Sequence, residues 1–267
     1  MSSKTATFRR LHESGCFVMP NPWDRGSAIY LEKLGFKAVA STSAGFAWSS
    51  GRPDNGITVE HALAHLKELA GSVSLPLNAD FEGGFAHDPS GVSANVTRAV
   101  ATGIAGLSIE DSSGDAKNPL YDFTLAVQRV KAARAAIDAS GTGVLLTARS
   151  EGFFVGRPDI KETIKRLEAY AAAGADCLYA PGIRTKEDIE AVVKAVAPKP
   201  VNLLVTGPWM SLADATALGV RRISVGAALA RSAWLGFAKA AVDMAEHGTF
   251  GSFGSGGPPL DLNGMFR

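Results

Sequence analysis

Short apolar segments alternate along the chain with longer segments whose apolar residues recur every three or four positions. Each short segment has four to six residues and is rich in Val, Ile, Leu or Phe. Such continuous apolar runs are typical of strands that are covered on both faces, as in parallel sheets. The predicted strands are Cys16–Met19, Ala38–Thr42, Leu75–Ala79, Gly106–Ile109, Gly143–Ala148, Asp176–Tyr179, Val201–Val205 and Arg222–Val225.

The longer segments have the apolar spacing of amphipathic helices, and several stop at a glycine that leads into the next strand. The predicted helices are Ser27–Leu34, Thr58–Leu69, Ala94–Thr102, Thr124–Ala139, Asp159–Ala173, Lys186–Val196, Leu212–Leu218 and Ala227–Glu246. Eight strand–helix units predict an α/β fold of the (β/α)₈ barrel type. The alternative is a doubly wound open sheet, but no Gly-rich dinucleotide-binding motif follows any strand.

Composition argues against several classes of protein. The 267 residues are 46% hydrophobic and carry 27 basic against 26 acidic side chains, a net charge of +1. This balance argues against nucleic acid and against an anionic membrane as partners. No apolar run is long enough to span a membrane, and the first ten residues do not resemble a signal peptide. The two cysteines, Cys16 and Cys177, are far apart in the sequence, which favours a reducing cytoplasm.

The chain divides into one catalytic domain, residues 1–247, and a Gly/Pro-rich tail, residues 248–267. The tail also carries five large apolar residues: Phe250, Phe253, Leu260, Leu262 and Phe266. One interpretation is a flexible terminus, and the other is an arm that packs on a neighbouring subunit.

Polar residues gather where several predicted strands end. Asp80 follows the third strand, Glu110 the fourth and Arg149 the fifth, while Thr42-Ser43-Ala44-Gly45 forms a small-residue turn after the second. In a (β/α)₈ barrel these ends meet on one face, where the chemistry is found. Carboxylates are ligands for Mg²⁺, the arginine fork fits a carboxylate or phosphate, and backbone N–H groups of the turn can bind an oxyanion.

Six motifs together resemble the isocitrate lyase/phosphoenolpyruvate mutase superfamily over about residues 6–245. They are Pro20-Asn21-Pro22-Trp23-Asp24, Thr42-Ser43-Ala44-Gly45, Gly51-Arg52-Pro53-Asp54, Pro76-Leu77-Asn78-Ala79-Asp80, Gly106-Leu107-Ser108-Ile109-Glu110-Asp111 and Thr147-Ala148-Arg149-Ser150-Glu151. The resemblance implies a Mg²⁺-dependent enzyme, with Mn²⁺ as a possible substitute, that acts on small 2-oxo or 2-hydroxy acids. It also implies a homo-oligomer, a dimer or tetramer, with the last barrel helix exchanged between subunits.

The resemblance also implies roles for individual residues. Asp54, Asp80 and Glu110 match acidic residues of the metal site, with Asn78 beside them. The turn of Thr42, Ser43, Ala44 and Gly45, together with Arg149, matches the groups that bind the substrate carboxylate and oxyanion. Lys117 and Asn118 fall in the mobile gating loop, and Asn118 resembles a gate asparagine of phosphonate-processing members. The alternative for these two is a solvated lysine and a turn asparagine before Pro119.

Three departures from the family pattern restrict the activity. Asn78 stands where an aspartate is usual, which predicts weaker metal binding. Residues 112–120 lack the Cys-Gly-His motif of the isocitrate and methylisocitrate lyases, and Ala180-Pro181-Gly182 replaces a glutamate of those lyases. We therefore expect a carbon–carbon lyase of the oxaloacetate decarboxylase kind that works through an enolate, and not a true isocitrate or methylisocitrate lyase. The alternatives are phosphonate chemistry, by a phosphorylmutase or phosphonopyruvate hydrolase, and a non-catalytic barrel that binds 2-oxo acids.

Overall fold

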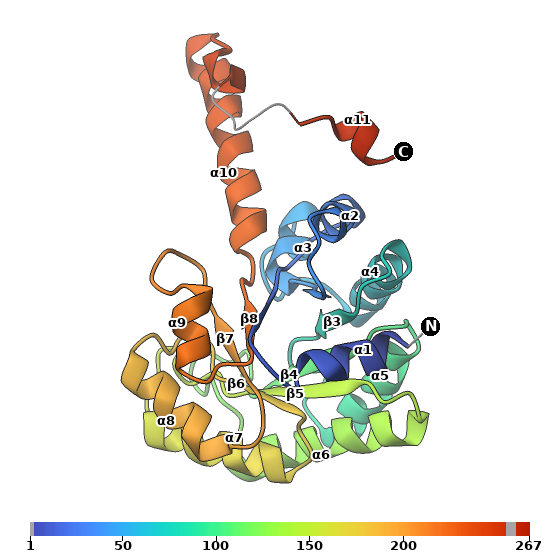
Figure 1. Ribbon diagram of the computed structural model, residues 1–267, viewed down its shortest axis with the longest axis vertical. Coiled ribbons are helices and arrows are strands. Elements are labelled where there is room, and N and C mark those ends of the chain that lie inside the picture. Colours follow the sequence, from blue (N-terminus) through green and yellow to red (C-terminus); the bar gives the residue numbers. More distant parts are fainter. Residues whose placement is uncertain (1–2, 255–259) are drawn as a thin grey trace.

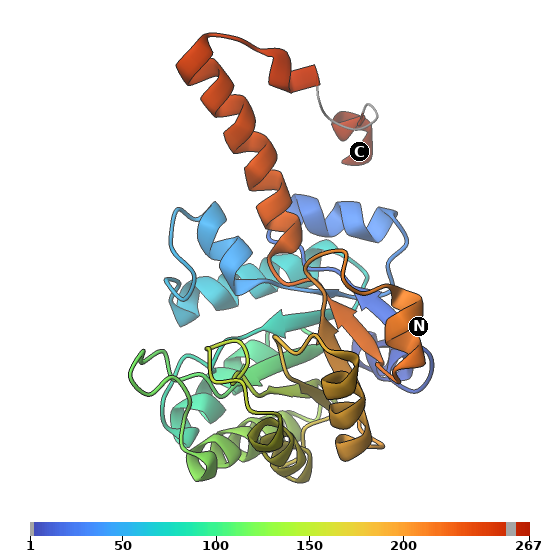
Figure 2. The ribbon, with the colours of Figure 1, turned by 90° about the vertical axis from the view of Figure 1, so that its left-hand side faces the viewer.

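Eight parallel strands form a nearly closed (β/α)₈ barrel in the computed structural model, which describes residues 3–254 and 260–267 (Figures 1 and 2). The strands are β1 (Phe17–Met19), β2 (Val39–Ala40), β3 (Leu77–Asp80), β4 (Gly106–Glu110), β5 (Leu145–Arg149), β6 (Cys177–Tyr179), β7 (Val201–Leu204) and β8 (Arg222–Ser224). Sequential strands pair from β2 to β8, and β8 pairs with β1. A single backbone bond, from Ala40 N to Pro20 O at 3.0 Å, joins the β1 and β2 ends. The predicted barrel is thus confirmed, and the doubly wound alternative is wrong.

All eight predicted helices are present, most of them within two or three residues of the expected bounds. The helices are α1 (Lys4–Leu11), α2 (Arg25–Lys33), α3 (Ser43–Ser49), α4 (Val59–Ser72), α5 (Pro89–Val100), α6 (Phe123–Ser140), α7 (Ile160–Ala172), α8 (Lys186–Val196), α9 (Leu212–Ala217), α10 (Ala228–Val242) and α11 (Leu262–Met265). The start of α5 was predicted five residues too late, because Asp88 caps that helix and Pro89 is its first residue.

Two short helices within the barrel domain were not predicted, and both matter for the site. In α1, Phe8 is completely buried and packs with Met19, Ala38 and Leu145, so that this helix closes the N-terminal end of the barrel. In α3, Thr42 is the N-cap, and its hydroxyl accepts from Gly45 N at 3.3 Å. The Thr42–Gly45 segment, predicted as a turn, is therefore the first turn of a helix.

The last barrel helix, α10, projects away from the barrel instead of packing along it (Figures 1 and 2). It continues into a π-helical turn, Asp243–His247, and a 3₁₀ turn, Gly251–Gly254. The short helix α11 then lies against α2, where Lys33 Nζ donates to Met265 O. Of the Gly/Pro-rich tail, residues 255–259 lie outside the described residues. Across the described residues, no helix is long and apolar enough to cross a membrane.

Candidate active site

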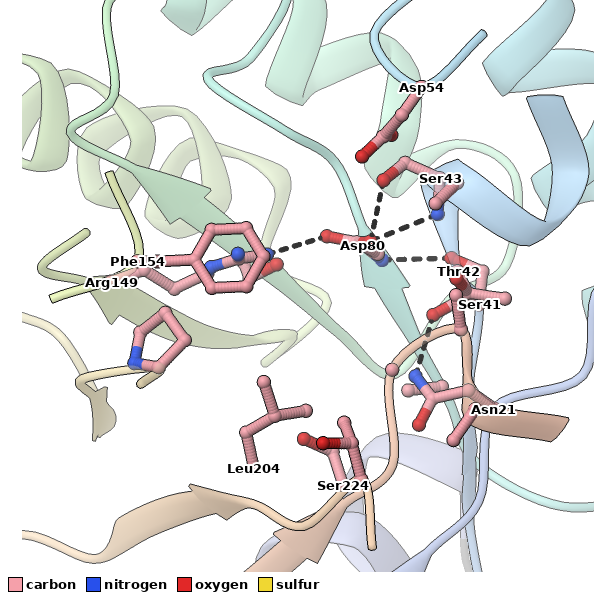
Figure 3. Close-up of a pocket in the computed structure, with 18 of the residues that line it drawn as sticks. Asn21, Ser41, Thr42, Ser43, Asp54, Asp80, Arg149, Phe154, Leu204 and Ser224 are labelled. Carbon is pink, nitrogen blue, oxygen red and sulfur yellow. Dashed lines mark hydrogen bonds and ion pairs between the residues drawn. The ribbon is translucent and has the colours of Figure 1, made fainter. Parts of the chain in front are cut away.

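A cavity of about 660 Å³ opens at the C-terminal ends of the strands, where barrel enzymes carry their chemistry. Its wall includes most of the residues predicted from the strand ends and from the family resemblance: Thr42, Ser43, Ala44, Asp54, Asn78, Asp80, Glu110 and Arg149. Gly45 is not part of the wall, although it lies in the same helical turn. Figure 3 shows Asp80 at the centre, with Arg149 on one side and Ser43 on the other.

Arg149, the last residue of β5, forms ion pairs with three carboxylates. Its Nη1 lies 2.9 Å from Asp80 Oδ1, its Nη2 3.2 Å from Glu110 Oε2 and its Nε 2.7 Å from Glu151 Oε1. Burial alone would lower the pKa of Arg149, but the three carboxylates together raise it above its usual value. The guanidinium is therefore a permanent cation that holds strands β3, β4 and β5 together at the cavity.

Asp80, the last residue of β3, connects Arg149 to helix α3. Its Oδ2 accepts from both Ser43 N, at 3.0 Å, and Ser43 Oγ, at 2.9 Å. The backbone N of Asp80 donates to Ser41 Oγ at 2.8 Å. Since Ser43 N and Gly45 N already donate within the protein, the first turn of α3 positions Asp80 rather than offering all its amides to a ligand. This corrects the expectation that the whole turn is open to an oxyanion.

Two further carboxyl groups lie in the cavity wall beside Arg149. Glu110, the last residue of β4, accepts from Ser112 Oγ at 3.1 Å, and burial raises its pKa. Glu151 is almost completely buried, and burial raises its pKa while the charge of Arg149 lowers it. Glu151 was not predicted as a site residue. Its place two residues after Arg149 was the available signal, since the loops that follow the strands of a barrel carry its site residues.

Glu82 is a second site residue that the sequence did not single out. It lies in the loop after β3, lines the cavity, and has a left-handed backbone with φ of 48°. Its Oε1 is buried and, within the described part of the chain, has no hydrogen-bond partner. Burial and the negative charges of Asp80, Glu110 and Asp54 raise its pKa to about 8. Strained, unpaired groups of this kind cluster at functional sites.

The remaining predicted residues are placed differently. Asn78 lines the cavity and is 4% exposed, with its Oδ1 unpartnered among the described residues. Asp54 lies at the exposed rim of the same cavity. Lys117 and Asn118 lie on an exposed loop, where Lys117 N and Asn118 Nδ2 both donate to the Asp115 carboxylate. The structure does not bring these two into the cavity wall, so their catalytic role stays a prediction.

The donor chemistry of the cavity fits a hard divalent cation. Five carboxyl groups (Asp54, Asp80, Glu82, Glu110 and Glu151) line it together with three arginines (Arg149, Arg222 and Arg231), and Glu82 Oε1 has no hydrogen-bond partner among the described residues. Oxygen donors of this type are the ligands that Mg²⁺ takes. Among the described residues, however, no three such side chains already converge as a metal site. The physical reason is that Arg149 and Ser43 hold Asp80, while Arg149 and Ser112 hold Glu110.

Comparison with known proteins agrees with this geometry. A crystal structure from Burkholderia cenocepacia J2315, of a protein classed only provisionally as a lyase or mutase, is 44% identical and has a TM-score of 0.94, covering 98% of this chain and 96% of that one. Oxaloacetate acetylhydrolase with bound oxalate is 27% identical, with a TM-score of 0.86 over 98% of this chain and 93% of that one. The oxaloacetate decarboxylase of Paraburkholderia xenovorans is 30% identical and covers 82% of this chain and 73% of the relative.

The model of the family described as phosphoenolpyruvate phosphomutase matches residues 8–245, which include all eight strands and the helices from α2 to α10. The chain therefore belongs to this family, within the isocitrate lyase/phosphoenolpyruvate mutase superfamily of lyases and mutases.

Proposed function

We propose that the protein is a divalent-cation-dependent lyase that cleaves a carbon–carbon bond in a small 2-oxo acid, with oxaloacetate as the first substrate to test. The observation that carries this proposal is the Arg149 ion-pair cluster with Asp80 and Glu110 at the strand ends. The relatives that act on oxaloacetate support the same choice.

The residues have distinct parts in the proposed reaction. The guanidinium of Arg149 binds the 2-oxo carboxylate of the substrate after releasing one of the protein carboxylates with which it is paired. Asp80 and Glu110, with Asp54, Glu82 and Asn78 nearby, would hold Mg²⁺ or Mn²⁺, which supplies a Lewis acid for the 2-oxo group. When oxaloacetate loses carbon dioxide from C3, the bonding electrons move into the enolate of pyruvate. Arg149 stabilises the negative charge on the enolate oxygen, and a proton from solvent water then adds to C3 to give pyruvate.

A proton donor of the isocitrate lyase type is not part of this proposal. Cys16 lies just before β1 and Cys177 is buried in β6, and neither lines the cavity. We therefore propose that methylisocitrate is not a substrate. Phosphonate chemistry remains the second candidate, because the matching family is described as a phosphomutase.

The test is a Mg²⁺-dependent activity screen over oxaloacetate, phosphonopyruvate and methylisocitrate, with EDTA as the metal-free control. We expect turnover of oxaloacetate, loss of it in EDTA, and a fall in kcat/KM of roughly 10²-fold or more for Arg149→Lys. Asp80→Ala should also abolish Mg²⁺ binding measured by calorimetry. Turnover of phosphonopyruvate alone would select the second candidate, and inactivity on all three would favour a barrel that only binds 2-oxo acids.

We also propose that the protein is a homo-oligomer in which a second copy covers α10. Five large apolar side chains of this helix are exposed: Leu229, Trp234, Leu235, Phe237 and Val242. So many exposed large apolar side chains on one helix indicate an interaction site. Exchange of α10 between two copies, with the tail beyond residue 247 as part of the same arm, would bury it.

A further inference from the structure

The cavity has opposite charges at its two ends. Asp80, Glu110 and Glu151 lie at the strand ends, whereas Arg222 lines the cavity from β8. Arg222 is only 2% exposed. Within residues 3–254 and 260–267, no carboxylate lies at ion-pairing distance from its guanidinium. A buried cation without a counter-ion therefore stands at the floor of the cavity.

The hydrogen-bond partners of Arg222 are all neutral. Its Nε donates to Asn202 Oδ1 at 2.7 Å, its Nη2 to Thr147 Oγ1 at 3.1 Å, and its Nη1 lies 3.3 Å from His12 Nε2. Burial and the charge of Arg222 lower the pKa of His12 to about 3, so this imidazole is neutral at ordinary pH. These bonds use three of the five guanidinium N–H donors.

We propose that Arg222, at the floor of the cavity, forms an anion-binding subsite for a second carboxylate at the far end of the substrate. A buried charge that has only neutral partners carries a large desolvation cost, and an incoming carboxylate would offset it through charge-assisted hydrogen bonds. The carboxylates at the rim of the cavity repel the second carboxylate of the ligand, so this end of the ligand points inward, toward Arg222. This inference rests on the proposed function, in which Arg149 binds the 2-oxo carboxylate.

The barrel geometry sets the length of this ligand. Thr147, the partner of Arg222, lies two residues before Arg149 on β5, which corresponds to about 7 Å along the strand. Linear 2-oxo acids with a terminal carboxylate and five or six carbons are therefore the first ligands to test. The wall between the two arginines is polar, with Asn78, Ser108 and Ser224, so it admits a hydrated or hydroxylated chain.

The test compares matched ligands by calorimetry in the presence of Mg²⁺. Oxalate measures binding at Arg149 alone. The diacids 2-oxoadipate and 2-oxoglutarate carry the terminal carboxylate. The corresponding acids without it are 2-oxohexanoate and 2-oxopentanoate. We expect each diacid to bind about tenfold or more tightly than its partner acid. Arg222→Gln should reduce this ratio to within about twofold. Arg221→Gln is the matched control, since Arg221 is the neighbouring residue and donates instead to Gly15 O near the surface; it should retain the ratio.

The outcomes separate this inference from the proposed function. Equal binding of diacid and partner acid by a protein that binds oxalate would overturn the anion subsite and leave the proposed function intact. An unchanged ratio in Arg222→Gln would overturn it as well. Failure of oxalate to bind would overturn the proposed function and, with it, the subsite. If Arg222→Gln does not fold, Arg222→Lys replaces it: the lysine keeps the charge but not the fork, so the ratio should fall several-fold, and an unchanged ratio would contradict the subsite.

Discussion

At the scale of single residues, the site is dominated by carboxyl groups in excess over cations. Arg149 compensates three of them through ion pairs, and Glu82 has a buried oxygen with no hydrogen-bond partner among the described residues. Substitutions of Glu82 and Asn78 therefore test most directly how the charges of the cavity affect stability and metal binding.

Glu82 should make the stability of the metal-free protein depend on pH. The pKa of this carboxyl is raised from 4.5 to about 8, so between these values the folded protein keeps a proton that the unfolded chain releases. Its stabilising contribution is therefore complete below pH 4.5 and lost as the pH rises through 8, with a slope of at most about 1.4 kcal/mol per pH unit. Urea unfolding in EDTA at pH 5.5, 6.5 and 7.5 should show this slope in the wild type and a shallower one in Glu82→Gln.

An exposed carboxylate on α8 provides the control for that experiment. Glu190→Gln should leave the slope of the wild type unchanged, because this side chain lies in solvent. Parallel profiles for the wild type and Glu82→Gln would mean that Glu82 is ionised in the folded state across this range.

Asn78→Asp should tighten Mg²⁺ binding. Two opposite unit charges about 4 Å apart attract by roughly 4 kcal/mol at an effective dielectric of 20, before desolvation is subtracted, so the net gain is well below that value. In the absence of metal the same change should lower the free energy of unfolding, because it adds a carboxylate at a position that is 4% exposed. Calorimetric titration of the wild type and Asn78→Asp with Mg²⁺ measures the two affinities. Equal affinity would place Asn78 away from the ion.

At the scale of elements, a buried network attaches α7 to the strands that carry the site. Asp111, directly after β4, accepts from Arg166 Nη1 at 3.1 Å, from Tyr170 Oη at 2.6 Å and from Glu151 N at 2.8 Å. Arg166 and Tyr170 belong to α7, whereas Glu151 follows β5. One carboxylate thus fixes the position of a helix and of the loop that presents Glu151 to Arg149.

Asp111→Ala should destabilise the protein by about 3–5 kcal/mol, because it breaks the buried Arg166–Asp111 ion pair and leaves Arg166 with Glu162 as its remaining carboxylate partner. Tyr170→Phe removes only one hydrogen bond to the same carboxylate and should cost about 1–3 kcal/mol. Urea unfolding measures both changes. A loss in Asp111→Ala no larger than that in Tyr170→Phe would show that the carboxylate is not the centre of this network.

At the scale of the whole molecule, α10 is the element that the barrel does not bury. Phe237 is 63% exposed and Val242 is 48% exposed. Burial of each such side chain against a second copy would contribute about 1.5–3 kcal/mol. Neither residue lines the cavity, so both can be changed without altering the site.

Phe237→Glu combined with Val242→Glu should therefore dissociate the assembly. Light scattering after size-exclusion chromatography should give a multiple of 27.8 kDa for the wild type and about 27.8 kDa for the double variant. Lys239→Gln, on the same helix, serves as the control and should retain the assembly. A wild type that has the mass of one chain would contradict the proposed oligomer.

The fold could be predicted from the sequence because apolar periodicity depends on local chemistry. Strand β4, Gly106–Glu110, and helix α8, Lys186–Val196, were predicted to within one residue, since each has a clear apolar pattern and a clear stop signal. Helix α1 was missed because it precedes the first strand and lies outside the strand–helix repeat, and α3 was missed because its start was interpreted as a small-residue turn after the second strand. The strand ends also indicated Asp80, Glu110 and Arg149, because parallel strands in a barrel finish on one face.

The sequence by itself determined the eightfold strand–helix repeat and the set of charged residues at its C-terminal face. Only the tertiary structure decided which of these charged residues contact one another. It joined Asp80 to both Ser43 and Arg149, placed Lys117 and Asn118 on an exposed loop, and brought Glu82, Glu151 and Arg222 into the cavity wall. The physical reason is that burial and pairing depend on contacts between strands far apart in the chain, such as β5 with β8 through Thr147 and Arg222, and no local pattern of residues specifies those contacts.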